Sequence, residues 1–155
     1  MKKNVKILLY MRRKKIKQND DDPTDDIVLN QRMVLDAWPD LATCTEVYYR
    51  FYPTMAQYRR EKQSLMNIEC TTQFTRSINK HCTTEDLKLR VVDALTKLLC
   101  RIPCGGLVNT QIKERTDLWH IRISYFWRIF YRKNDKTIRL LEFCPHKKPA
   151  YSRRL

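Results

Sequence analysis

The residues best suited to phosphate binding and proton transfer gather near the end of the chain. His120, Arg122 and Arg128 occupy polar positions of two segments that alternate with apolar residues, and His146 and Tyr151 follow a third such segment. A guanidinium group can bind a phosphate through two parallel hydrogen bonds. An imidazole titrates near neutral pH, so it can accept or donate a proton under ordinary conditions. The sequence therefore predicts a site for phosphate chemistry if these groups share one surface.

Alternation predicts the strands that would bring these groups together. In residues 118–124 and 127–132, every second residue is apolar, so each segment has one apolar and one polar face. The turn signal "KNDK" then predicts a hairpin to a third strand over residues 137–144. Alternation in this third strand is less regular, which indicates a central strand or a β-bulge.

An amphipathic helix is predicted to cover this sheet. Residues 83–103 carry one apolar stripe, with Thr83 and Asp86 as an approximate capping box and a proline and two glycines after it. A strand over residues 66–74 and a short helix over residues 74–81 precede it. The expected fold is α+β: a small antiparallel sheet of about four strands with two helices on one face, in the order β-α-α-β-β-β.

Residues 1–65 differ from the rest in composition. They hold 13 Lys or Arg against 9 Asp or Glu, whereas residues 66–155 hold 18 against 8. A basic run and the acidic run "NDDDPTDD" predict a partly disordered, otherwise helical extension. The alternative interpretation places the natural start of the domain at Met66, with the upstream residues dispensable.

The net charge of +14 predicts a polyanionic partner, such as nucleic acid, an anionic membrane or an acidic protein. The apolar run near the start, "ILLYM", is too short for a signal peptide, and no stretch is long enough to span a membrane. We therefore expect a cytoplasmic protein without membrane contact. Six cysteines are then expected to be reduced, and the loose Cys100–Cys104 and Cys144–His146 spacing does not indicate a metal site.

Residues 66–155 resemble the RelE/HigB/ParE superfamily of toxins from type II toxin–antitoxin systems, and their RelE/HigB-like branch in particular. The motifs that carry the resemblance are "LWHIRI", "WRIFY", "IRLLEF" and "HKKPAY", preceded by the helix "LKLRVVDALTKLL". Two positions depart from the usual pattern: Trp127 stands where tyrosine is common, and Lys147 stands where arginine is common.

The resemblance implies a metal-free endoribonuclease that cuts messenger RNA on the ribosome and is held by a cognate antitoxin. In that reaction a ribose 2′-hydroxyl attacks the adjacent phosphate, which requires a proton acceptor, a cation and a proton donor. Arg128 and Arg122 are the predicted phosphate ligands, and His146 is the predicted base, with His120 as its competitor and Tyr151 to stack or to orient a proton. The predicted RNA-binding cations are Lys147, Lys148, Arg132 and Lys133.

Two other functions fit the same sequence. A toxin that inhibits DNA gyrase would use the same scaffold without a nuclease site, and a basic RNA-binding protein could have lost activity. Each candidate residue also has an ordinary structural interpretation, such as a solvated arginine on a sheet or a histidine in a loop. The clustering of titratable groups favours the nuclease, because a pure binding module does not require them.

Overall fold

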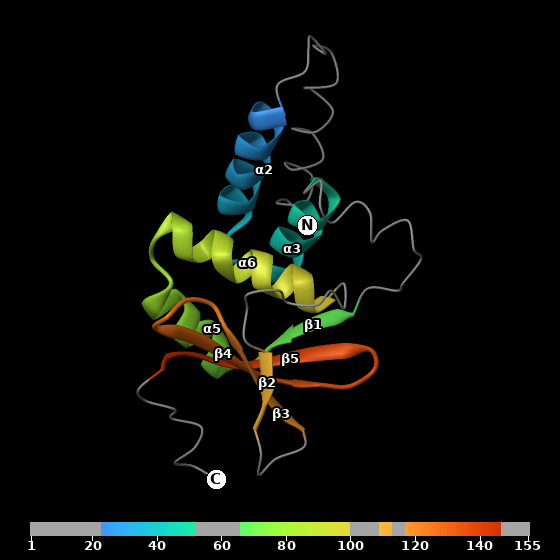
Figure 1. The fold of residues 1–155 in the computed structure, drawn as a ribbon, viewed down its shortest axis with the longest axis vertical. Helices are drawn as coiled ribbons and strands as arrows, with labels where there is room; N and C mark the ends of the chain where they lie inside the picture. The colour runs from blue at the N-terminus through green and yellow to red at the C-terminus, as the bar shows by residue number, and fades with distance from the viewer. Residues whose placement is uncertain (1–22, 52–65, 100–108, 113–116, 147–155) are drawn as a thin grey trace.

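The computed structural model describes residues 23–51, 66–99, 109–112 and 117–146 (Figure 1). Four helices and five strands lie within these ranges. The helices are α2 (Pro23–Ala37), α3 (Leu41–Phe51), α5 (Thr72–His81) and α6 (Glu85–Leu99). The strands are β1 (Asn67–Cys70), β2 (Asn109–Gln111), β3 (Leu118–Arg122), β4 (Trp127–Lys133) and β5 (Thr137–Pro145). The expected α+β class is confirmed.

The strands form one sheet in the order β1-β5-β4-β3-β2. Pairing is antiparallel from β2 to β5, but β1 runs parallel to β5. The prediction of an antiparallel sheet of about four strands was therefore wrong in two details: the sheet is mixed, and it has a fifth strand. That strand, β2, holds only three polar residues, so no apolar alternation marked it.

The two faces of the sheet separate as the alternation predicts. Ile121 of β3, Ile129 of β4 and Phe143 of β5 are fully buried in the main core beneath the helices. Their neighbours along each strand point to the opposite face. There a smaller apolar cluster holds Leu118, Phe130, Leu141 and Cys144, with the polar side chains around it.

Helix α5 replaces β1 as the neighbour of β5 beyond Leu140. The Thr71 hydroxyl caps α5 by accepting from Phe74 N at 3.1 Å, and it donates to the Leu141 carbonyl at 3.1 Å. The Ser77 hydroxyl accepts from Phe143 N at 3.0 Å. These bonds satisfy backbone groups at a register shift between β4 and β5 that lies at Phe130/Tyr131. Both explanations of the irregular third strand, a central position and a bulge, are confirmed.

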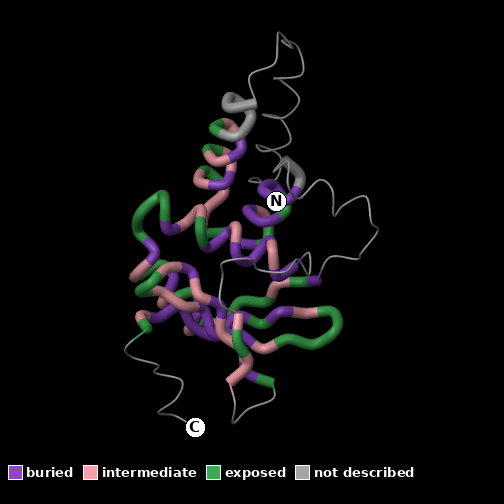
Figure 2. Tube along the Cα trace, viewed as in Figure 1, coloured by how far each residue is buried: buried purple, intermediate pink, exposed green. Residues whose placement is uncertain are grey.

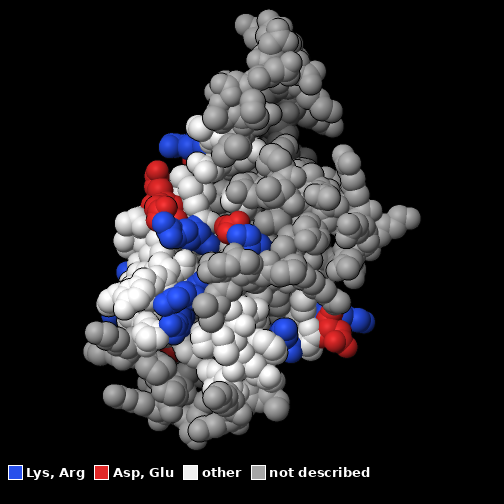
Figure 3. Space-filling model, in the orientation of Figure 1, with Lys and Arg blue, Asp and Glu red and all other residues white. Residues whose placement is uncertain are grey.

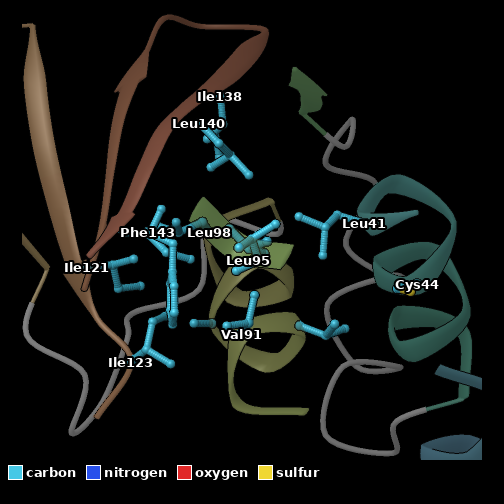
Figure 4. Close-up of a cluster of buried hydrophobic side chains, with 14 of the residues drawn as sticks. Leu41, Cys44, Val91, Leu95, Leu98, Ile121, Ile123, Ile138, Leu140 and Phe143 are labelled. Carbon is cyan, nitrogen blue, oxygen red and sulfur yellow. The ribbon is translucent and has the colours of Figure 1, made fainter. Parts of the chain in front are cut away.

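Helix α6 lies between the sheet and α3 (Figure 4). Val91 and Leu95 are fully buried within it, and buried segments concentrate where α6, α3 and the sheet meet (Figure 2). The cap differs by one position from the prediction. Thr84, not Thr83, accepts from a backbone N–H of the first turn, that of Leu87 at 3.3 Å. Adjacent threonines made this position ambiguous in the sequence.

The N-terminal helices share the main core. Val34 of α2 and Leu41 and Cys44 of α3 are buried in the same cluster as α6 and the sheet. The Cys44 thiol donates to the Val34 carbonyl at 3.3 Å, which joins the two helices. Whether residues 1–65 are dispensable therefore depends on how much these buried side chains contribute to the free energy of folding. As a separate finding, none of the helices within the described residues is long and apolar enough to cross a membrane.

We expect Leu41→Ala to lower the free energy of unfolding by about 2–5 kcal/mol, because Leu41 is only 4% exposed in the shared core. Urea titration followed by circular dichroism measures this value. Val28→Ala is the matched control: Val28 is 63% exposed on α2, so its loss should change stability by no more than about 0.5 kcal/mol. An unchanged midpoint in Leu41→Ala, together with a stably folded Met66–Leu155 fragment, would show that the N-terminal helices are dispensable.

Candidate nucleic-acid interface

Two arginines face each other across the outer side of the sheet. The antiparallel register pairs Arg122 of β3 with Arg128 of β4, and it pairs Arg128 with Cys144 of β5. Like charges directly opposite each other on a sheet are unfavourable. Burial, and then the charge of Arg122, lower the pKa of Arg128, although an arginine stays protonated at physiological pH. This pair would be stabilised by an anion placed between the two guanidinium groups.

Three buried side-chain nitrogens of this site make no hydrogen bond within the described residues. The Nε atoms of Arg122 and Arg128 and the Nδ1 atom of His120 are buried, yet none has a hydrogen-bond partner among the described residues. Buried polar groups in native proteins are nearly always paired, so such atoms call for an explanation. The two arginine side chains are direct neighbours on the sheet, so an anion between their guanidinium groups would supply the missing counter-charge.

The imidazole of His120 lies one row further along the same face. It is opposite Phe130, with the two ring centroids 5.6 Å apart. Burial lowers the pKa of His120 from its ordinary 6.5, and the charges of Arg128 and His146 lower it further. The ring is therefore neutral near pH 7, as a proton acceptor must be.

His146 approaches from the end of β5. Its backbone N–H donates to the Phe126 carbonyl at 2.7 Å, which fixes the end of β5 against the β3–β4 turn. Its side chain is exposed, and its charge acts on His120. Four of the five predicted catalytic residues thus lie near one end of the outer face: His120, Arg122, Arg128 and His146. The fifth, Tyr151, lies outside the described residues.

The predicted RNA-binding cations divide into two groups. Arg132 Nε lies 3.1 Å from a carboxylate oxygen of Asp117, and the ammonium of Lys133 sits 3.8 Å from the Trp119 ring centroid. Arg132 therefore has a counter-charge, although its Nε atom makes no hydrogen bond within the described residues, and Lys133 has an aromatic partner. Lys147 and Lys148 lie outside the described residues.

Glu142 and Cys144 are two members of this face that sequence reasoning did not select. Glu142 is only 9% exposed, and its Oε2 atom lacks a hydrogen-bond partner within the described ranges. Burial raises the pKa of Cys144 to about 12, and Glu142 contributes to the shift. The thiol is therefore protonated and a poor nucleophile or metal ligand. A glutamate inside the apolar run "IRLLEF" was the available signal.

The helical side of the molecule carries compensated charge. Ion pairs one helical turn apart join Arg32 to Asp36, Arg90 to Asp86 and Lys97 to Asp93. Acidic and basic groups accordingly lie beside one another over the helices in Figure 3. By contrast, residues 118–133, which include β3 and β4, contain four Lys or Arg and no Asp or Glu. Arg132 pairs with Asp117, whereas Arg122 and Arg128 have no ion pair within the described residues.

Metal ligands do not converge in the described part of the chain. No group of three or more His, Cys, Asp or Glu side chains is close enough there to hold an ion. Cys100 and Cys104 lie outside the described ranges, so this result concerns only Cys144 and His146 of the loose spacing noted in the sequence.

Comparison with known proteins finds no matching family model and no matching curated protein. Solved structures do match about half of the chain. One is the E. coli DinJ-YafQ toxin-antitoxin complex, with 14% identity, 54% of this chain and 96% of that chain covered, and a TM-score of 0.46. A copper-bound mutant toxin from Helicobacter pylori matches with 15% identity, coverage of 54% and 97%, and a TM-score of 0.42.

A third match is a toxin-antitoxin complex from Mycobacterium tuberculosis, with 17% identity, coverage of 54% and 100%, and a TM-score of 0.35. Identities and TM-scores this low do not transfer an activity or the role of a residue. The chemistry of this chain has to be judged from its own side chains.

We expect the pKa of His120 to lie below 6.5 and to rise toward that value in Arg128→Ala, because the substitution removes a neighbouring positive charge. NMR titration of the histidine ring protons measures both values. Arg90→Ala is the control, since Arg90 pairs with Asp86 on α6, away from the sheet's outer face. A His120 pKa at or above 6.5, or one that is unmoved in Arg128→Ala, would contradict the proposed electrostatic coupling.

Proposed function

We propose that this chain is the toxin of a type II toxin–antitoxin system and cuts messenger RNA on the ribosome. The observation that carries the proposal is the Arg122–Arg128 pair, whose Nε atoms lack acceptors among the described residues, with a neutral His120 beside it. A phosphate would satisfy the guanidinium groups, and a neutral imidazole suits proton abstraction. The proposal rests on these residues and the sequence motifs, because the matched toxin structures are too distant to lend their activity.

The arginines would act on the scissile phosphate. During in-line attack, negative charge builds up on the non-bridging oxygens of the five-coordinate phosphorus. Fixed cations that already point at this position stabilise the transition state without having to reorganise. Arg128 lies between β3 and β5 and is held by both strands, so it is the better fixed of the two. Arg122 would share the same phosphate from β3.

The two histidines would move the protons. His120 accepts the proton of the ribose 2′-hydroxyl as the 2′-oxygen bonds to phosphorus. The bond from phosphorus to the 5′-oxygen then breaks, and His146 gives that oxygen a proton. The products are a 2′,3′-cyclic phosphate and a 5′-hydroxyl end. The sequence favoured His146 as the base, with His120 as its competitor. Here the order is reversed, because burial and the charge of Arg128 favour the neutral form of His120.

The partners follow from the charge of the same face. A cognate antitoxin with an acidic segment would cover the arginine pair and hold the toxin inactive, and the ribosome would present the messenger RNA. Such chemistry takes place in the cytoplasm, where messenger RNA is translated.

We expect the full-length protein to cut a messenger RNA during translation in vitro, at in-frame codons seen by primer extension. Arg128→Ala should slow cleavage by about 10²–10³-fold, because it removes a preorganised cation. His120→Ala and His146→Ala should each slow it by about 10²–10⁴-fold, as is typical for loss of a general base or acid. Arg90→Ala, which alters an exposed ion pair on α6, should cut at the normal rate.

The cleavage assay, together with a gyrase supercoiling assay and an RNA-binding assay, separates the alternatives. Intact messenger RNA together with inhibition of DNA supercoiling by gyrase would identify a gyrase-inhibiting toxin. Intact messenger RNA and normal supercoiling, with RNA binding retained, would identify an inactive RNA-binding protein. Equal cleavage by the wild type and Arg128→Ala would mean that the arginine pair is not the phosphate site.

We expect cleavage to continue without a bound divalent ion, since the proposed groups supply both the charge and the proton transfers. Ribosomes require magnesium, so the suitable measurement is repeated cleavage after the toxin alone has been treated with EDTA and desalted. Activity equal to that of the untreated toxin is the expected result. Loss of activity that added zinc or another transition metal restores would contradict the metal-free mechanism.

A further inference from the structure

Two successive aromatic residues are exposed in the turn that joins the strands of the arginine pair. Tyr125 is 85% exposed and Phe126 is 52% exposed, in the turn between β3 and β4. Only Val28, far away on α2, is a comparably exposed large hydrophobic residue within the described ranges. A single exposed apolar residue requires no explanation, but two successive exposed aromatics in the turn that follows Arg122 and precedes Arg128 do.

The turn that carries these rings is fixed rather than loose. The Ser124 hydroxyl accepts from the backbone N–H groups of Phe126 and Trp127, each at 3.2 Å. The Phe126 carbonyl accepts from His146 N at 2.7 Å, and the Trp127 carbonyl accepts from Ile123 N at 2.9 Å. These bonds fix the backbone that carries both rings, so little backbone entropy would be lost when the rings contact a ligand.

Stacked rings connect the turn to the core. Trp127 lies parallel to the buried Phe143, with centroids 4.8 Å apart and an interplanar angle of 9°. Phe126 meets Trp127 edge-on at 6.2 Å, and His81 of α5 lies 5.3 Å from Trp127 on a tilted plane. Phe126 is thus supported from below by Trp127, while half of its surface stays available to a ligand.

Positive charge directly adjoins one of the exposed rings, that of Tyr125. The Arg122 guanidinium carbon lies 5.6 Å from the Tyr125 ring centroid. Arg122 in turn faces Arg128 across the strands. An aromatic surface within one side-chain length of a paired guanidinium matches the dimensions of a nucleotide, whose flat base and charged phosphate are joined by a ribose.

We propose that Tyr125 and Phe126 form a stacking surface for an unpaired RNA base, next to the phosphate held by Arg122 and Arg128. The inference deepens the proposed function, on which it rests, by adding two residues that contact the substrate and by requiring the bound nucleotide to be unstacked. An RNA base is favoured over an apolar protein segment because the Tyr125 ring adjoins Arg122, which faces a second arginine, Arg128, and neither has an ion pair within the described residues.

The test is fluorescence anisotropy of the full-length protein with a single-stranded 2′-O-methyl RNA of about 12 nucleotides, which has no 2′-hydroxyl for attack. A second probe of equal length replaces the central bases with abasic residues and keeps every phosphate. We expect the wild type to prefer the base-bearing probe by about tenfold. Tyr125→Ala should lose most of this preference, whereas Tyr125→Phe should keep it because the ring remains.

Salt dependence distinguishes stacking from charge. Tyr125→Ala should leave the slope of log K against log salt unchanged, since no phosphate contact is lost. Arg122→Ala should reduce its magnitude by about 0.7, the value for one phosphate contact on a single strand. Phe126→Ala should behave like Tyr125→Ala, but Phe126 also contacts Trp127, so its thermal unfolding has to be compared with that of the wild type.

Three results would overturn the inference: equal affinity of the wild type for the two probes, no measurable binding of the base-bearing probe at low salt, or a probe preference that survives Tyr125→Ala. Each of these results comes from binding alone, so it tests the stacking surface separately from messenger RNA cleavage. A protein that prefers bases through Tyr125 but does not cut messenger RNA would refute the nuclease and keep the stacking surface. A protein that cuts messenger RNA but does not prefer the base-bearing probe would keep the nuclease and refute the stacking surface.

Discussion

The register between β3 and β4 is the constraint on which the site depends. Ile121 and Ile129 are paired across these strands and completely buried beneath the helices, so a one-residue shift of either strand would turn its isoleucine out of the core. The same register places Arg122 opposite Arg128 on the other face. Burial of apolar side chains thus maintains a pairing of like charges that the two arginines would not adopt by themselves. The core supplies the free energy, and the outer face gains a position where an anion relieves the repulsion.

The helices support this arrangement from behind. α5 bonds to β5 where β1 ends, through Thr71 and Ser77, and keeps β5 beside β4 past the register shift. α6 covers the apolar side of the strands and is itself covered by α3 (Figure 4). Ion pairs along α2 and α6 neutralise charge locally. On the sheet, Arg132 pairs with Asp117 and Arg139 with Glu69, while Arg122 and Arg128 have no ion pair within the described residues. The uncompensated charge of the sheet is therefore the arginine pair.

Sequence patterns predicted the parts of this structure that depend on local periodicity. The faces of β3 and β4, the turn at Asn134 and the helix that became α6 follow from alternation, turn chemistry and an apolar stripe. The strand β2 and the parallel direction of β1 could not be predicted, because short polar strands and pairing partners leave no periodic signal. His120, Arg122 and Arg128 could be selected because they share a face in sequence. The lowered pKa of His120 and the burial of Glu142 depend on neighbours from other strands, so only three-dimensional contacts reveal them.

The central claim is that Arg122 and Arg128 hold one phosphate between their guanidinium groups. The most direct measurement is a ¹H–¹⁵N NMR titration of arginine Nε signals with a short single-stranded RNA whose 2′-hydroxyls are replaced by hydrogen. The account predicts large, saturable shifts for Arg122 and Arg128 at the same RNA concentration, while Arg32 and Arg90 on the helices stay nearly unmoved. Shifts spread evenly over all four arginines, or a response of the helical arginines alone, would contradict it.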